Sequence, residues 1–306
     1  MSHDTPPHGH GLAGEDHELL RSAPPERALS WSAAALGRGA RVVRVWALEG
    51  GASSAVHALD VRDRLGRTHS LVLRRLVRPE WLAEEPLALA REAAALELVR
   101  GSEVRTPELV SVDVGGTEAG EPALLMTRLA GGIEWHPADL ESFLHALAVV
   151  LPRIHATPLP TDPGVPPYDP YELELARPPR WASQPVAWQR AMELFKGPAP
   201  LAESCFIHRD YHPGNVLWAD GELAGVVDWV HASVGSPDAD VGYCRANLAG
   251  RFGLEAADRF LDHYQAIAGR SDFHPYWDIA AALGGFGEEH FDRNDERFLA
   301  HALRRL

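Results

Sequence analysis

The sequence predicts an α+β protein in which an N-terminal antiparallel sheet with one helix precedes a mostly helical C-terminal part. Three observations support this prediction. Short strand-like apolar runs follow one another between residues 42 and 126, with a single amphipathic helix among them. The composition becomes helical after a glycine-containing segment at 129–132. The chain has 306 residues, a length typical of about two domains.

The N-terminal elements are expected in the order β-β-β-α-β-β. The first two strands are joined by a glycine-containing loop typical of a β-hairpin. The helix places Leu89, Ala93, Leu96 and Val99 on one face. The expected strands are 42–48, 55–61, 71–74, 109–114 and 123–126, and the expected helix is 84–100. This pattern predicts a sheet with one helix across it.

Three regions are expected along the chain. Residues 1–30 mix His, Pro, Gly and acids without apolar periodicity, which predicts a flexible arm. Residues 31–129 form the first lobe, and 130–306 form the second, helical lobe. A broad apolar face predicts a helix over 138–156.

An irregular excursion is expected at 158–200, because 11 of the 24 prolines fall there, and a short helix is expected near its end at 186–195. Tyr168, Tyr171, Trp181 and Trp188 lie in this excursion. Their rings either line a substrate pocket or pack an irregular loop onto the core, and the sequence leaves both readings open.

The charge is divided unevenly. Of the net charge of −14, residues 133–306 carry −11. Such a surface repels phosphate backbones, so we expect no nucleic-acid partner. The acidity serves either solubility or the attraction of a cationic substrate.

Membrane and secreted classes are not expected. No apolar run approaches the ~20 residues of a membrane span. The two cysteines, Cys205 and Cys244, cannot form a disulfide framework, and no charged start followed by an apolar run marks a signal peptide. We therefore expect a reduced, cytoplasmic protein, either a monomer or a homodimer.

The strongest chemical signal lies between residues 206 and 229. Asp210 sits in a loop entered from an apolar strand, and Asn215 follows five positions later. A second apolar strand then ends at Asp228. Phosphoryl transfer asks for this set, with one Asp near the attacking hydroxyl and an Asn and a second Asp as oxygen ligands for Mg²⁺. In the alternative reading, Asp210 and Asn215 only cap turns.

These motifs resemble those of the aminoglycoside phosphotransferase family, small-molecule kinases that share the two-lobe protein-kinase-like fold. Residues 208–215 match the family's H-x-D-x-x-x-x-N loop, and 227–229 match its [IV]-D-[WF] element. Residues 235–240 resemble its G-x-P-x-x-D segment, and 151–155 its L-x-x-[IL]-H helix end. The resemblance implies an α+β fold and an ATP-dependent transfer to a hydroxyl group, with GTP as donor not excluded.

The resemblance also implies a role for each matched residue. Asp210 is the catalytic base or orients the hydroxyl, and Asn215 and Asp228 hold Mg²⁺. His208 and Asp240 support the catalytic loop.

The expected phosphate contact departs from the family pattern. The family uses a lysine on the third strand, paired with a glutamate on the next helix. Lys196 is the only lysine here, so by position Arg74 takes this role with Glu92 as its partner. An arginine stays charged and can donate two hydrogen bonds to a phosphate, and its guanidinium group is wider than the ammonium group of lysine. Arg75 is the alternative if the register is shifted by one residue.

Two further segments match the family's nucleotide contacts by position. The loop at 50–54 resembles the phosphate-covering loop, with Gly51, Ser53 and Ser54 as amide or hydroxyl donors. Residues 125–129 lie where the inter-lobe linker offers backbone groups to adenine, which includes Met126 and Arg128. Met126 is equally consistent with a plain core residue.

Other classes remain as alternatives. A protein kinase is disfavoured because no D-F-G or A-P-E segment follows the catalytic loop. A zinc site at His208-x-Asp210-x-His212 lacks further ligands nearby. The unusual Arg74 leaves open a non-catalytic nucleotide-binding protein.

An aminoglycoside, a macrolide or a metabolic alcohol would each suit as the acceptor. An acid-rich stretch at 285–296 favours a cationic, aminoglycoside-like compound. Its candidate ligands are Glu288, Glu289 and Asp292.

Overall fold

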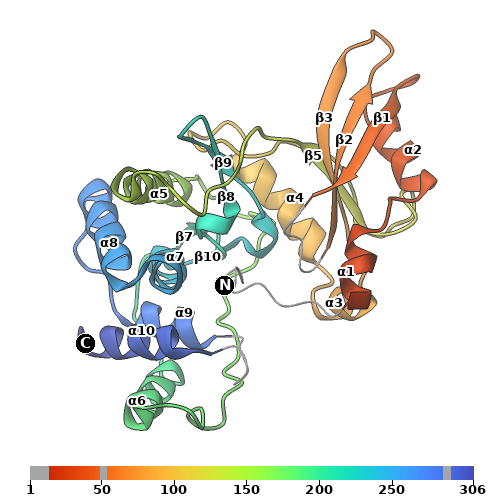
Figure 1. The fold of residues 1–306 in the computed structure, drawn as a ribbon. Coiled ribbons are helices and arrows are strands. Elements are labelled where there is room, and N and C mark those ends of the chain that lie inside the picture. Colours follow the sequence, from red (N-terminus) through yellow and green to blue (C-terminus); the bar gives the residue numbers. More distant parts are fainter. Residues whose placement is uncertain (1–13, 49–53, 285–290) are drawn as a thin grey trace. The chain divides into compact units, whose positions relative to one another are not determined.

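The structure is a computed structural model that describes residues 14–48, 54–284 and 291–306 (Figure 1). The described chain divides into two compact units, each of which is considered by itself. The N-terminal unit contains residues 14–100 and 105–130, and the C-terminal unit contains 101–104 and 131–306. The division between residues 130 and 131 falls within the glycine-containing segment at 129–132.

The N-terminal unit is built on a five-stranded antiparallel sheet in the order β1-β2-β3-β5-β4. The predicted fold class is confirmed. The strands are β1 (Arg41–Ala47), β2 (Ala55–Arg62), β3 (Thr68–Arg75), β4 (Leu109–Asp113) and β5 (Ala123–Thr127). Because side chains alternate along a strand, β3 sends Leu71 and Leu73 to one face of the sheet and Arg74 to the other.

The two faces have different partners. On the face of Leu71 and Leu73, helix α2 (Glu26–Ala34) buries Ala28 and Trp31 in a common core (Figure 1). On the face of Arg74, helix α4 (Ala88–Val99) brings up the buried Glu92. Helix α4 is shorter than the helix predicted over 84–100. A separate helix, α3 (Pro79–Glu84), precedes it, and the proline at position 86 separates the two.

The expectation of a flexible arm over 1–30 is wrong for the described residues of that segment. Helix α1 (Gly14–Arg21) and most of α2 lie there. Each helix is shorter than the window in which periodicity is visible, and the segment between them contains two prolines. Their stability comes from tertiary packing: Leu20, Ala28 and Trp31 are all buried.

The C-terminal unit is mostly helical, as predicted. Helices α5 (Leu140–His155) and α6 (Pro185–Phe195) lie close to the expected spans. Helix α5 packs against α8, and α7 packs against both α8 and α9. The remaining helices are α7 (Pro237–Phe252), α8 (Leu254–Ala268), α9 (Tyr276–Leu283) and α10 (Arg293–Leu303). Within the described ranges, none of the helices is long and apolar enough to span a bilayer.

Short strands in this unit frame the catalytic-loop motif. Strand β7 (Cys205–Ile207) pairs with β10 (Ser233–Gly235), and β8 (Val216–Ala219) pairs with β6 (Gly132–Ile133) and β9 (Glu222–Val226). The chain leaves β7, forms the loop at 208–215, and enters β8. Both ends of the loop are thus fixed by backbone pairing.

Candidate active site

The loop at 208–215 is held from behind by Asp240. This fully buried carboxylate accepts hydrogen bonds from the backbone N–H of His208 at 2.9 Å and of Arg209 at 2.6 Å. His155 Nε2, at the end of α5, lies 3.0 Å from Asp240 Oδ2, the oxygen that also accepts from His208. A buried carboxylate needs such partners to remain in place. The motifs that the sequence analysis singled out at 151–155 and 235–240 thus meet at one carboxylate.

Side chains of the loop add further anchors. His208 Nε2 donates to the carbonyl of Val227 at 3.0 Å, and its Nδ1 accepts from the Asp210 N–H at 3.3 Å. The buried Tyr211 hydroxyl donates to the carbonyl of Leu147 on α5 at 2.9 Å. Both ring nitrogens of His208 are therefore used in positioning the loop. This arrangement speaks against the alternative zinc site.

Asp210 and Asn215 face each other within the loop. Asn215 Nδ2 donates to Asp210 Oδ2 at 2.8 Å and to the Asp210 carbonyl at 2.9 Å. The amide oxygen of Asn215 is consequently left for another partner. The turn depends on Gly214, where a Cβ atom would lie 2.5 Å from His212 Cε1. The short one-turn helix at Pro213–Asn215 can close only because this position carries no side chain.

Asp228 lies beside this pair. The N–H of Val227 donates to the carbonyl of Asn215 at 2.9 Å, which holds the end of β9 against the loop. Burial lowers the pKa of His212, and the charges of Asp210 and Asp228 oppose this shift. His212 Nε2 lies 3.9 Å from Asp210 Oδ1. The structure brings Asp210, Asn215 and Asp228 together, as the sequence predicts.

This donor set fits a magnesium ion. Carboxylate and amide oxygens are hard ligands of the kind that Mg²⁺ binds together with phosphate oxygens. Asn215 Oδ1 and the Asp228 carboxylate would hold the ion. The described residues contain no cluster of three or more His, Cys, Asp or Glu side chains able to hold a metal. A site here therefore depends on the amide of Asn215 and on the phosphates.

In the N-terminal unit, Arg74 and Glu92 form a buried ion pair. Arg74 Nε lies 3.3 Å from Glu92 Oε2, and their side chains are 6% and 0% exposed. Arg75 points to the opposite face, where it contacts Glu121 at 2.5 Å and the carbonyl of Ser22 at 2.9 Å. The geometry therefore gives the pairing with Glu92 to Arg74. A role of Arg74 toward a phosphate stays a prediction.

The other residues expected at the nucleotide have varied surroundings. Met126 is buried in β5, and Ser54 is buried just before β2. The Arg128 guanidinium stacks 4.7 Å from the centre of the Trp46 ring. The Arg128 side chain is thus engaged with Trp46, and a contact of residues 125–129 with a nucleotide base stays a prediction. Gly51 and Ser53 lie outside the described residues.

Two of the three acidic residues expected at the acceptor lie outside the residues that the structure describes. Glu288 and Glu289 lie outside the described residues. Asp292 is the N-cap of α10: its Oδ1 accepts from the N–H of Asn294 at 2.6 Å and of Asp295 at 3.2 Å. The Asp295 side chain accepts in return from the Asp292 N–H, which completes a capping box. Asp292 therefore has a structural role in this unit.

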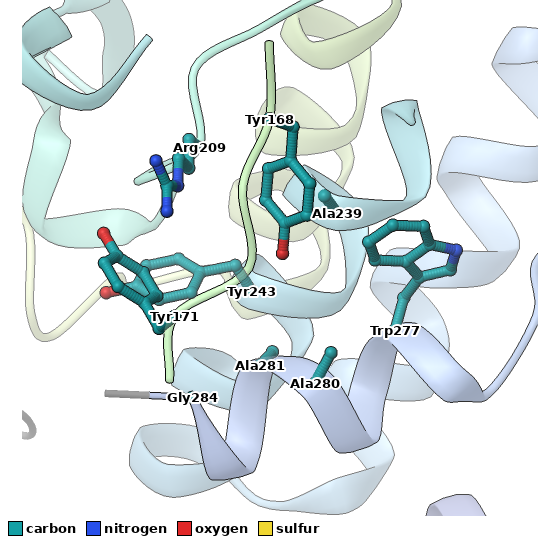
Figure 2. Close-up of a pocket in the computed structure, with 9 residues that line it drawn as sticks. All are labelled: Tyr168, Tyr171, Arg209, Ala239, Tyr243, Trp277, Ala280, Ala281 and Gly284. Atoms are coloured by element: carbon teal, nitrogen blue, oxygen red, sulfur yellow. The ribbon is translucent and has the colours of Figure 1, made fainter. Parts of the chain in front are cut away.

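Two residues beside Asp210 were not singled out in the sequence. Tyr243 on α7 meets the His212 ring edge-on at 6.0 Å between centroids, and burial together with the charge of Asp210 raises the pKa of Tyr243. Arg209 precedes Asp210 and has a left-handed backbone with φ of 67°. Both line a hollow shown in Figure 2. No local spacing signals Tyr243, because it reaches Asp210 only through the packing of α7.

Tyr168 and Tyr171 from the proline-rich excursion also line this hollow, and a role of these two rings toward a substrate stays a prediction (Figure 2). The other two rings behave differently. Trp188 is fully buried, and Trp181 meets it edge-on at 5.9 Å between ring centroids. Trp181 and Trp188 therefore pack the excursion onto the unit.

A kinase-like sheet unit followed by a helical unit with an anchored Asp–Asn loop and a second Asp defines the class of small-molecule phosphotransferases. The chain belongs to the Phosphotransferase enzyme family, whose profile matches residues 44–283. No curated protein sequence matches the chain significantly.

Solved structures of the same fold include antibiotic phosphotransferases. A thermostable mutant of an aminoglycoside phosphotransferase, in a ternary complex with AMP-PNP and hygromycin B, aligns with a TM-score of 0.59 and 14% identity, covering 92% of this chain and 98% of that one. A macrolide 2'-phosphotransferase from Brachybacterium faecium aligns with a TM-score of 0.56 and 18% identity, covering 92% of each chain. A mutant aminoglycoside 2'-phosphotransferase bound to GDP aligns with a TM-score of 0.57 and 16% identity, covering 90% and 94%. At these identities the likeness shows the fold.

Proposed function

We propose that this phosphotransferase is a small-molecule kinase that moves the γ-phosphoryl group of ATP to a hydroxyl group, with Mg²⁺. One observation carries the proposal. The Asp210 carboxylate is hydrogen-bonded by Asn215 at 2.8 Å within a loop whose backbone is held by the buried Asp240. A turn cap needs no buried carboxylate behind it, whereas a catalytic carboxylate needs a fixed position.

Asp210 would orient the acceptor hydroxyl and take its proton as the new O–P bond forms and the bond to the leaving ADP breaks. Asn215 would keep the Asp210 carboxylate turned toward the hydroxyl through its Nδ2 group, while its Oδ1 faces the metal. The ion, when bound, offsets the charge that develops on the phosphate oxygens. The other contributions come from positioning by this chain's own residues.

The nucleotide is proposed to meet Arg74. The Glu92 carboxylate holds the Arg74 guanidinium in one orientation, and a guanidinium can donate two parallel hydrogen bonds to phosphate oxygens. The similar structures named above contain AMP-PNP in one case and GDP in another, so both purines suit this fold. We propose ATP as the donor and include GTP in the test.

The charge-based expectation of a cationic acceptor is not included in this proposal. Of its three candidate residues, only Asp292 is described, and its carboxylate caps α10. The neighbouring acid Glu296 is also engaged, because it accepts hydrogen bonds from Ser183 N at 2.7 Å and from Trp188 Nε1 at 3.1 Å. The residues that would recognise the acceptor are therefore sought beside Asp210.

The test measures ADP or GDP release with Mg²⁺, first without an acceptor and then with a library of hydroxyl compounds. A kinase hydrolyses the nucleotide slowly alone and faster with an acceptor. Nucleotide binding without any turnover would instead favour the non-catalytic alternative. Neither binding nor turnover, in a protein shown to be folded by circular dichroism, would contradict the proposal.

A further inference from the structure

A hollow lined by aromatic rings lies in the C-terminal unit, and Arg209, the residue before Asp210, is one of its lining residues (Figure 2). Its space amounts to about 370 Å³ when the part open to solvent is included. The enclosed part holds only about one water molecule. A ligand would therefore lie, from the open side, against the aromatic wall of the hollow, which consists of Tyr168, Tyr171, Tyr243 and Trp277. Tyr168 and Tyr171 come from the proline-rich excursion, Tyr243 from α7, and Trp277 from α9.

The hollow is connected to the reacting position through two of its lining residues. Tyr243 meets the His212 ring edge-on at 6.0 Å between centroids, His212 Nε2 lies 3.9 Å from Asp210 Oδ1, and Arg209 is the residue before Asp210. An acceptor whose hydroxyl reaches Asp210 must therefore have the rest of its body close to these side chains. The wall of the hollow is where acceptor specificity would arise.

Arg209 gives the wall a positive charge. Its guanidinium lies 4.4 Å from the ring centre of Tyr171 and 5.2 Å from that of Tyr168, and it donates to the carbonyl of Asp169. Among the described residues, the buried Arg209 Nε finds no hydrogen-bond acceptor. An unmet buried donor favours a ligand that offers an oxygen atom.

The same wall disfavours ammonium groups. The faces of Tyr168 and Tyr171 already carry the Arg209 guanidinium, so a second cation there would be repelled. None of the described lining residues has a carboxylate, and the remaining ones, Ala239, Ala280, Ala281 and Gly284, are small and apolar. Within the described part of the chain, a compound with several ammonium groups therefore finds no carboxylate among the residues that line the hollow.

We propose that the acceptor is a hydroxyl compound with an apolar or aromatic ring, without ammonium groups, whose ring lies against Tyr171 and Tyr243 while an oxygen atom accepts from Arg209. The proposal rests on the proposed kinase function and names the substrate class of that site. Stacking on tyrosine faces and a charge-assisted hydrogen bond to Arg209 supply the recognition.

Three matched alcohols test the charge preference: 1-phenyl-1,2-ethanediol, mandelate and 2-amino-1-phenylethanol. They share a phenyl ring and a hydroxyl and differ in whether the second group is neutral, anionic or cationic. We expect kcat/KM for ADP release to be at least about tenfold higher with the neutral or anionic compound than with the amine. An aminoglycoside is assayed beside them. Faster turnover of the amine or of the aminoglycoside would overturn the proposal.

Two variants locate the effect. Tyr171→Ala should raise the acceptor KM about tenfold and leave the KM for ATP unchanged, because it removes a ring from the wall. Trp181→Ala is the matched control, since this ring belongs to the same excursion but contacts Trp188. Equal acceptor KM values in both variants would contradict the assignment of the wall.

The outcomes separate this proposal from the function on which it rests. ATP hydrolysis without acceptor, combined with no use of any of the three alcohols, would overturn the acceptor class and leave the kinase function standing. Absence of both nucleotide binding and hydrolysis in the folded protein would overturn the kinase function and the acceptor class together.

Discussion

Asp228 occupies a backbone conformation that most residues avoid. Its φ and ψ of 66° and 63° lie in the left-handed region. For residues other than glycine this costs about 1–2 kcal/mol, and Asp and Asn tolerate it best. Such strain persists where the surroundings fix the residue, which is common at functional sites. The structure is thus consistent with a carboxylate placed for a ligand rather than for stability.

We predict that Asp228→Asn weakens Mg·ATP binding by at least about tenfold, because a neutral amide replaces an anionic ligand of the ion. Asparagine retains the tolerance for the left-handed conformation, so the fold should be kept. Asp220→Asn is the matched control, since Asp220 is also left-handed, with φ of 52°, but lies in an exposed turn. Calorimetry with an ATP analogue and Mg²⁺ measures both; equal affinities would remove Asp228 from the metal site.

The ion pair of Arg74 and Glu92 calls for a paired substitution. Arg74→Ala alone would leave Glu92 as a buried, unpaired charge, at a cost of about 3–5 kcal/mol in stability. The double variant Arg74→Gln with Glu92→Gln removes both charges, so we expect a folded protein with a KM for ATP raised about tenfold or more.

Arg75→Ala is the comparison for this pair. Arg75 is buried against Glu121 on the other face of the sheet, so its loss should lower the melting temperature and leave the KM for ATP of the folded protein unchanged. Steady-state kinetics and thermal unfolding of both proteins test this. A KM raised only by Arg75→Ala would show that the phosphate contact belongs to Arg75.

At the scale of elements, Asp292 offers a clear test between a cap and a substrate ligand. Because it caps α10, we expect Asp292→Ala to lower the free energy of unfolding by about 1 kcal/mol and to leave the acceptor KM unchanged. Asp292→Ser, which retains capping ability without the charge, should recover most of the stability. Urea unfolding and acceptor kinetics distinguish the two roles. A raised KM in both variants would support a role in acceptor binding.

The strands were predictable and the first helices were not. The runs that become β2 and β3 alternate or remain apolar over enough residues to show a period of two, so their existence follows from sequence. Helices α1 and α2 have only eight and nine residues, and their buried side chains are covered by packing against the sheet. Whether such short segments form helices depends on tertiary contacts rather than on local propensity.

The candidate site also contains residues that were predictable from the sequence and residues that were not. Asp210, Asn215 and Asp228 were predictable because a single loop and the strand after it bring them together. Tyr243 and the hollow were not, since they depend on how α7, α9 and the excursion pack around the loop. The cap formed by Asp292 was not predictable either, because a sequence cannot tell a helix cap from a surface ligand, and the role of the acid-rich stretch toward an acceptor stays a prediction.

At the scale of the whole molecule, acid sensitivity is expected from the N-terminal unit. Burial lowers the pKa of His57 from 6.5 to about 4, and the charge of Arg75 adds to this shift. Between these values the unfolded chain binds a proton that the folded one does not. Stability is therefore complete above pH 6.5 and is lost as the pH falls toward 4.

We predict that His57→Gln reduces the loss of unfolding free energy between pH 6.5 and 4.5, by at most about 1.4 kcal/mol per pH unit. Urea unfolding of both proteins at these two pH values measures the difference. Between pH 6.5 and 7.5 the two proteins should change in parallel, which serves as the internal control. Identical pH dependence below 6.5 would show that His57 is not responsible.

The most direct test of the central claim compares Asp210→Asn with the parent protein in Mg·ATP turnover and nucleotide binding. If Asp210 orients the hydroxyl and accepts its proton, the variant binds Mg·ATP with unchanged affinity, while kcat falls at least about a hundredfold. The Asp220→Asn variant should keep the parental kcat. Parental turnover by Asp210→Asn would contradict the claim that Asp210 is the catalytic carboxylate of this phosphotransferase.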